Sequence, residues 1–99
     1  MYVRLSRGTY PPSLHTDVSA RLSASADSLI PALRFLSGCV SYYAGADEFS
    51  CSMVNISVWD TLEHAEAMSS LPPMPALGQE FTRMGVEFER PIVNYAALW

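Results

Sequence analysis

The sequence of 99 residues contains no lysine, and all six of its cations are arginines. Without a lysine amine, the chain cannot form a Schiff base with pyridoxal phosphate or build the P-loop that cradles nucleotide phosphates. Only 16% of the residues are charged, against about 25% in an average protein, and ten acids bring the net charge to −4. The arginines are scattered from Arg4 to Arg90 rather than gathered in a basic patch. We therefore expect no nucleic-acid partner.

Long apolar runs and metal-binding motifs are also missing. No run approaches the ~20 apolar residues of a membrane-spanning helix. A strand-like segment already begins at Tyr2, so we expect no signal peptide. The five glycines form no dinucleotide-binding fingerprint, and His15 and His64 lie too far apart for a metal-ligand pair. We expect a cytoplasmic protein with no membrane contact, no cofactor and no metal ion.

The hydrophobic residues, by contrast, make up 49% of the chain. Such a sequence is not disordered, and its length suits one domain over residues 1–99. A monomer of this size would leave many apolar side chains at its surface, and few charges are available to cover them. We therefore expect a homodimer, which would bury part of that surface.

Hydrophobic periodicity predicts the order strand, helix, strand, strand, helix, strand. The predicted strands cover residues 2–10, 40–44, 53–59, 86–89 and 92–95. The first predicted helix begins after a cap at Ser13, is interrupted at 23–28 and stops at Gly38. The second begins after a cap at Asp60, and the last runs from Pro75 to a stop at Gly85. This order is typical of the α+β class, as a ferredoxin-like βαββαβ antiparallel sheet with its helices on one face.

Two segments carry a family resemblance. Leu36–Tyr43 (LSGCVSYY) leads into a predicted hairpin, and Val54–Thr61 (VNISVWDT) follows. The pair resembles the antibiotic biosynthesis monooxygenase (ABM) branch of the dimeric α+β barrel proteins, in which a glycine turn opens the second strand and a strand ending in tryptophan precedes a helix. The resemblance extends from Tyr2 to Tyr95, and it implies a dimeric α+β barrel with a pocket between the sheet and the helices of each subunit.

The resemblance also implies site residues. In the cofactor-independent, quinone-forming members an asparagine four residues before the tryptophan shares the substrate pocket with it, and Asn55 and Trp59 match that spacing. The same enzymes also use tyrosines. Tyr42 and Tyr43 lie in the strand that carries one of these tyrosines, but the match is off by one position. The position of a second family tyrosine, later in the chain, is occupied here by Ala65. Asn55, Trp59 and Tyr43 are therefore the expected catalytic residues. The haem-degrading members use an asparagine in the first strand, which this chain lacks, so the resemblance disfavours haem degradation.

The third predicted strand supports a pocket on its own evidence. Strand periodicity places Met53, Asn55, Ser57 and Trp59 on one face, where an amide, a hydroxyl and an indole would suit a small aromatic or polyketide-like ligand. Expected substrate-binding residues are Tyr42, Ser57, Met53 and His64, of which His64 could carry a proton near neutral pH. The alternative is that Trp59 belongs to the core and that Asn55 ties down a neighbouring backbone group.

Two functions follow as hypotheses. The first is a cofactor-independent monooxygenase that oxidises a small aromatic or polyketide-like substrate with dioxygen. The second is a non-catalytic, small-molecule-binding or structural homodimer of the same fold, which the displaced tyrosines favour. Arg34 and Arg83 could bind an anionic ligand, although solvated surface arginines are the commoner case. Cys39 and Cys51 lie far apart along the predicted hairpin, and we expect both to be free thiols.

Overall fold

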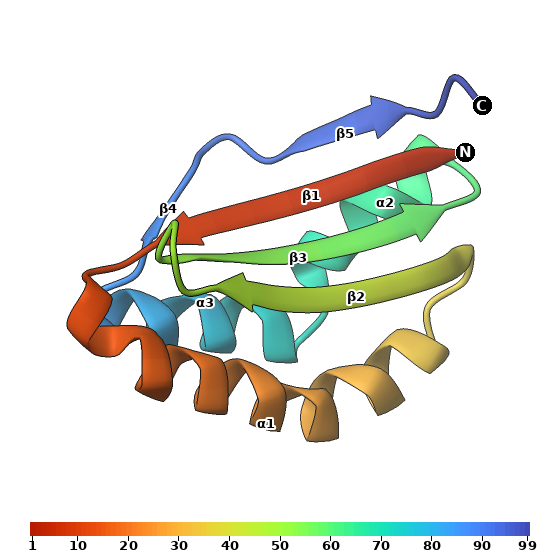
Figure 1. Cartoon of the computed structure of the whole chain (residues 1–99). Helices are drawn as coiled ribbons and strands as arrows, with labels where there is room; N and C mark the ends of the chain where they lie inside the picture. Colours follow the sequence, from red (N-terminus) through yellow and green to blue (C-terminus); the bar gives the residue numbers. More distant parts are fainter.

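The computed structural model describes all residues 1–99 and contains a five-stranded antiparallel sheet with its helices on one side (Figure 1). The strands are β1 (Tyr2–Thr9), β2 (Cys39–Asp47), β3 (Ser52–Trp59), β4 (Glu87–Phe88) and β5 (Val93–Ala96). The helices are α1 (His15–Arg34), α2 (Leu62–Ala67) and α3 (Pro73–Met84), with short 3-10 turns η1 (Pro12–Leu14) and η2 (Met68–Ser70). The predicted ferredoxin-like α+β architecture is confirmed.

The strand order is β2-β3-β1, with β4 and β5 both paired to the remaining edge of β1. β4 pairs with Gly8 and Thr9 at one end of β1, and β5 pairs with residues 2–5 at the other end. The central strand therefore holds both ends of the chain together, because Tyr2 lies opposite Ala96. In the register of β1 with β3, Ser6 lies opposite Asn55.

Helix α1 runs without interruption over 20 residues, so the predicted break at 23–28 is wrong. The serine-rich stretch stays helical because its hydroxyls are satisfied inside the helix: Ser25 donates to the Leu22 carbonyl and Ser28 donates to the Ser25 carbonyl. Ser25 is also buried, so packing against the sheet side holds the segment in place. The helix ends at Arg34, before the expected stop at Gly38.

The predicted helix caps are displaced. Ser13 caps nothing, because it lies inside η1 and the residue before α1 makes no side-chain cap. Thr61, and not Asp60, caps α2, and its hydroxyl accepts the backbone N–H of His64. The Asp60 carboxylate is engaged elsewhere, since it pairs with the His64 ring.

Helix α3 begins at Pro73 rather than Pro75, because proline is well suited to the first position of a helix. It ends as predicted at Gly85, which has a left-handed conformation with φ of 116°. Strand β2 is longer than predicted and extends to Asp47.

The hydrophobic core lies between the sheet and the helices. Its central side chains are fully enclosed, with Trp59 and Val18 at 0% exposure. Thirteen buried residues form one cluster: Tyr10, Val18, Leu22, Leu29, Leu33, Met53, Trp59, Ala65, Met68, Leu71, Leu77, Phe81 and Val86. None of the helices is both long and apolar enough to cross a membrane.

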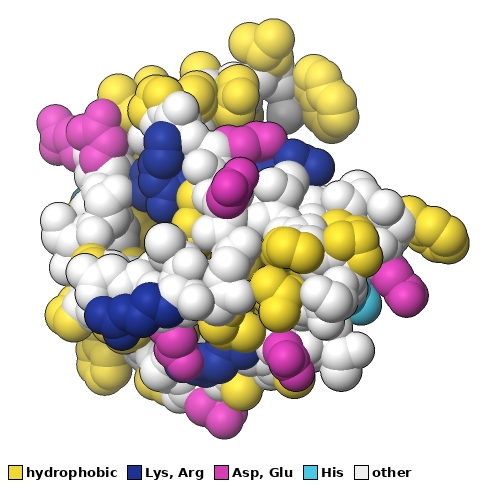
Figure 2. All heavy atoms as spheres, turned by 90° about the vertical axis from the view of Figure 1, so that its left-hand side faces the viewer, with side chains coloured by type: hydrophobic (Ala, Val, Ile, Leu, Met, Phe, Trp, Pro, Cys, Tyr) yellow, Lys and Arg dark blue, Asp and Glu magenta, His cyan; other side chains and the backbone are white.

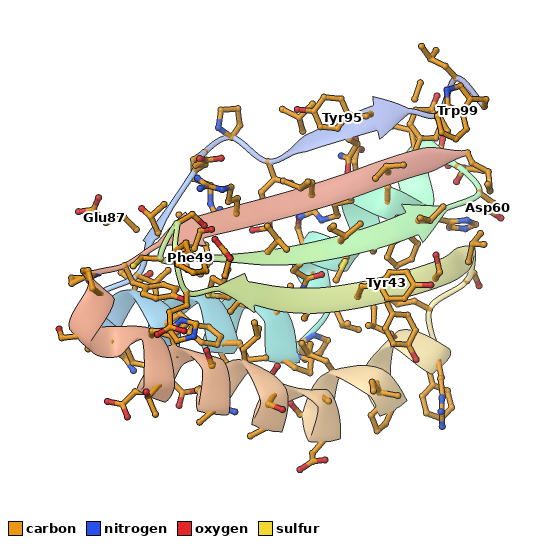
Figure 3. The ribbon with its side chains drawn as sticks, viewed as in Figure 1. Tyr43, Phe49, Asp60, Glu87, Tyr95 and Trp99 are labelled. Atoms are coloured by element: carbon orange, nitrogen blue, oxygen red, sulfur yellow. The ribbon has the colours of Figure 1, made fainter.

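The other side of the sheet carries no helix (Figure 1). Alternation along the strands places Val54, Ile56 and Val58 of β3 on this open side, beside Val3 and Leu5 of β1. On the flanking strands, the large side chains Tyr43, Val93 and Tyr95 are exposed to solvent. Figure 3 shows Tyr43 on β2 and Tyr95 on β5. Figure 2 shows that hydrophobic side chains also gather at the top of the molecule, where β5 and the C-terminal residues lie.

Candidate functional site

The larger of the two main cavities lies between the helix-facing side of the sheet and helices α1 and α3. It has a volume of about 600 Å³ and is partly open to solvent. Its walls are mainly apolar, and they include Leu29, Met53, Leu77, Phe81, Phe88 and Ile92. Its polar lining includes Arg4, Ser6, Asn55, Ser69, Thr82, Arg83 and Arg90. An apolar enclosure with a few polar groups is the usual form of a small-molecule site.

A second cavity of about 470 Å³ lies between α1 and β2. Leu22, Ser25, Leu29 and Asn55 line both cavities, so the two adjoin beneath β3. Asn55 is the only amide side chain of this shared wall. A ligand in either cavity would therefore meet the same group.

The Asn55 amide has no hydrogen-bond partner within the protein. No side-chain polar atom of the chain is both sealed from solvent and unpaired, so the amide must be reachable through the cavities. A structural tie to the backbone, the alternative considered from the sequence, is therefore not present. An asparagine amide with free donors and an acceptor can orient an oxygen atom of a bound molecule.

Trp59 and Ser57 occupy a different position. Both are at most 1% exposed, and the Trp59 Nε1–H donates to the Ser57 hydroxyl over 2.8 Å. The Ser57 hydroxyl in turn donates to the Met68 sulfur. Neither Trp59 nor Ser57 lines either of these two cavities. The structure thus places them in the core next to the cavity wall, on the same strand face as Asn55.

The remaining predicted site residues divide between the two cavities and the surface. Met53 lines the first cavity, whereas Tyr42 and Tyr43 line the second, with Tyr43 largely exposed. His64 lines neither of them. It lies in α2, and its Nδ1 is 2.6 Å from the carboxylate of Asp60, a contact that lowers the pKa of Asp60. Figure 3 shows Asp60 just after the end of β3.

Arg4 and His15 are two of the polar cavity residues that the sequence did not predict as site residues. Arg4 is 6% exposed and lines the first cavity, while His15 lines the second. His15 hydrogen bonds to the Tyr10 hydroxyl at 2.8 Å and to Ser19 at 3.4 Å. The alternation of Arg4 and Ser6 with apolar neighbours predicts strand β1. This pattern does not show which face of the strand meets the helices.

The two arginines and two cysteines considered from the sequence also have clear positions. Arg83 lines the first cavity, whereas Arg34 lines neither and is exposed. Cys39 opens β2 and Cys51 lies in the turn at the other end of that strand, so the pair cannot form a disulfide within the chain. Burial raises the pKa of the Cys39 thiol, which disfavours the reactive thiolate. The chain contains no cluster of three His, Cys, Asp or Glu side chains able to hold a metal ion.

No protein-family model and no curated protein matches this sequence. Solved structures do match its fold. A candidate antibiotic biosynthesis monooxygenase from Deinococcus radiodurans has a TM-score of 0.74 at 18% identity, over 98% of this chain and 92% of that protein. A second antibiotic biosynthesis monooxygenase has a TM-score of 0.72 at 15% identity, over 99% of each chain.

A third similar structure is SnoaB, a cofactor-independent oxygenase from Streptomyces nogalater. It has a TM-score of 0.63 at 18% identity, over 99% of this chain and 93% of SnoaB. Identities this low carry the fold and not the activity. The chain therefore has the ABM-like, ferredoxin-like α+β fold that these proteins share.

Proposed function

We propose that the protein is a cofactor-independent monooxygenase that oxidises a small aromatic or polyketide-like substrate with dioxygen. The observation that carries this proposal is the free Asn55 amide at the junction of two apolar cavities. The likeness to the oxygenase SnoaB supports it at the level of the fold. A flat aromatic ring would lie against Leu29 and Phe81, with one of its oxygens at Asn55.

The proposed reaction converts an electron-rich phenol into a quinone. The phenol first loses its proton, and the ring carbon opposite the ionised oxygen then bonds to dioxygen. When the O–O bond breaks, one oxygen atom remains on that carbon as a carbonyl, and the other leaves as water together with the two hydrogens lost from the ring carbon and the hydroxyl. The ring is oxidised by four electrons and dioxygen is reduced by four, so no cofactor has to supply electrons.

The polar residues of the cavities would divide this work. Asn55 would hold the substrate oxygen and stabilise its negative charge as it develops. Tyr42, which lies opposite Ser57 on the helix-facing side of the sheet, would donate or relay a proton, whereas Tyr43 lies opposite Ile56 on the open side. Trp59 and Ser57 would act by fixing the strand that carries Asn55, because their hydrogen bond holds the C-terminal end of β3 in place.

We further propose that the protein acts as a homodimer joined through the open side of the sheet. Val54, Ile56 and Val58 form an apolar row there, and the exposed Tyr43 and Tyr95 flank it. A second copy of the same surface would bury this row and bring the covered area into the range of an obligate interface, above about 1,600 Å².

Oxygen uptake with anthrone, whose enol form is a phenol of the required kind, tests the proposed reaction. The protein should consume one dioxygen for each anthraquinone formed, and heavy-oxygen-labelled dioxygen should leave one labelled atom in the product. The Asn55→Leu variant keeps a similar volume but loses both polar functions, and its kcat/KM should fall by about ten- to a hundredfold. Ser28→Ala, on the exposed side of α1, is the control and should match the parent.

A different outcome would favour the second hypothesis. No acid and no histidine lines the first cavity, so it contains no conventional general base, which favours binding without turnover. Anthrone that binds to the parent and not to Asn55→Leu, without oxygen uptake above buffer, would identify a non-catalytic binding protein. Equal rates for the parent and Asn55→Leu would contradict the proposed role of this residue.

A further inference from the structure

Arg4 is a buried cation with no acidic partner. Its guanidinium donates to the Ser69 hydroxyl at 2.7 Å and to the Asn94 amide oxygen at 3.4 Å, and both partners are neutral. The three ion pairs of the protein involve other residues. A charged group in a protein interior is strongly destabilising unless an opposite charge accompanies it. An arginine at 6% exposure without such a charge therefore calls for an explanation.

The surroundings increase this excess of positive charge. Burial and the nearby Arg90 both lower the pKa of Arg4, and the charge of Glu66, which forms no ion pair with it, only partly opposes them. Arg83 and Arg90 line the same cavity, and the lining contains no Asp, Glu or His. Arg83 is partly offset by Glu80 outside the lining, whose pKa it helps to lower. The cavity as a whole remains positive.

The geometry of this cavity also limits the shape of a ligand. The Arg90 guanidinium lies 4.9 Å from the centre of the Phe88 ring, so these two side chains form one wall. Arg4 and Asn94 face each other across β1 and β5, and the neighbouring Ser6 lies opposite Asn55. Arg4 and Asn55 are thus two polar groups on one side of an apolar chamber.

We propose that this cavity binds an organic anion, a flat apolar molecule whose ionised oxygen group is held by Arg4. The proposal rests on the proposed function, whose substrate class it names: either an aromatic carboxylate or a phenol that ionises when it binds. A guanidinium binds either kind of oxygen anion by charge-assisted hydrogen bonds. For a phenol, the positive charge would replace the missing general base, since it favours the ionised form and the proton leaves to water.

Binding of 1-naphthoate and of its uncharged analogue 1-naphthamide, measured by calorimetry at pH 7, tests the proposal. The parent should bind naphthoate at least tenfold more tightly than naphthamide. Arg4→Met should remove this preference, and Arg4→Lys should retain part of it because the charge is kept. Arg34→Met is the matched control: it removes an exposed arginine outside both cavities and should keep the full preference.

Equal affinities for the two ligands in the parent would overturn the proposal, and this comparison needs no variant to fold. A preference that survives in Arg4→Met would overturn it equally. The absorbance of bound 1-naphthol distinguishes the two classes of substrate. A naphtholate band at pH 7 that is absent in Arg4→Met indicates a phenol. A preference for naphthoate without this band indicates a carboxylate. Intact naphthoate preference without oxygen uptake would contradict the monooxygenase alone and leave the anion site standing.

Discussion

Replacing Ser57 by alanine removes the hydroxyl that accepts the Trp59 indole N–H. This hydrogen bond measures 2.8 Å, and both side chains are at most 1% exposed, so water cannot take the place of the lost acceptor. A buried donor left without a partner costs about 1–3 kcal/mol. For a domain of this size each kcal/mol lowers Tm by about 4–8 °C. We therefore expect Ser57→Ala to lower the free energy of unfolding by about 1–3 kcal/mol.

Urea unfolding at a fixed protein concentration, followed by circular dichroism, measures this change. Ser28→Ala is the matched control, because Ser28 is exposed and its hydroxyl donates only to a carbonyl of its own helix. This variant should remain within about 0.5 kcal/mol of the parent. The contrast between the two serines isolates the effect of the buried partner.

A double-mutant cycle makes the reasoning refutable. Trp59→Phe removes the indole N–H, so in that background Ser57→Ala leaves no orphaned donor and should cost less than about 1 kcal/mol. If Ser57→Ala destabilises the protein equally in both backgrounds, the loss comes from packing, and the hydrogen bond does not explain the burial of these two residues.

Three further outcomes follow from the fold. Light scattering should give about twice the chain mass of 10.9 kDa, and Ile56→Arg on the open side of the sheet should reduce it to the monomer mass; a parent monomer would refute the proposed dimer. Denatured protein prepared without reductant should titrate two thiols per chain, from Cys39 and Cys51, and a count of zero would refute the geometry. Pairing with His64 lowers the pKa of Asp60, so this contact should stabilise the fold above pH ~4 and lose its effect as the pH falls further. The Tm difference between the parent and His64→Ala should therefore shrink below pH ~4.

The fold could be predicted from the sequence because its signals are local. Strand periodicity and the proline and glycine positions gave the element order, and Gly85 ends α3 where expected. The predicted break in α1 failed because the burial of Ser25 against the sheet side, which keeps a serine-rich segment helical, is a tertiary effect. Local propensity cannot contain that information.

The site could be predicted only in part. Asn55 could be predicted as a site residue because its strand shows a clear two-residue period and because its spacing to Trp59 matches the family pattern. That Trp59 lies outside both cavities depends on its bond to Ser57 and its contact with the helices, which the sequence does not encode locally. The role of Arg4 could not be predicted for a similar reason, since its side chain contacts Asn94, which lies 90 positions away in the sequence.

The unpaired charge of Arg4 has a consequence for stability that separates function from structure. Its two partners are an exposed serine and a half-buried asparagine, so Arg4→Met would leave no sealed polar group without a partner. It would also remove a buried charge and add apolar surface to the cavity wall.

Tm should therefore stay unchanged or rise in Arg4→Met, whereas Arg21→Met, which breaks a two-point ion pair with Glu80 at the surface, should lower it slightly. An arginine of a buried ion pair would behave in the opposite way, with a loss of about 3–5 kcal/mol on removal. A clear drop in the Tm of Arg4→Met, measured by calorimetry beside the parent, would mean that this residue holds the fold together, and the need for a bound anion would disappear.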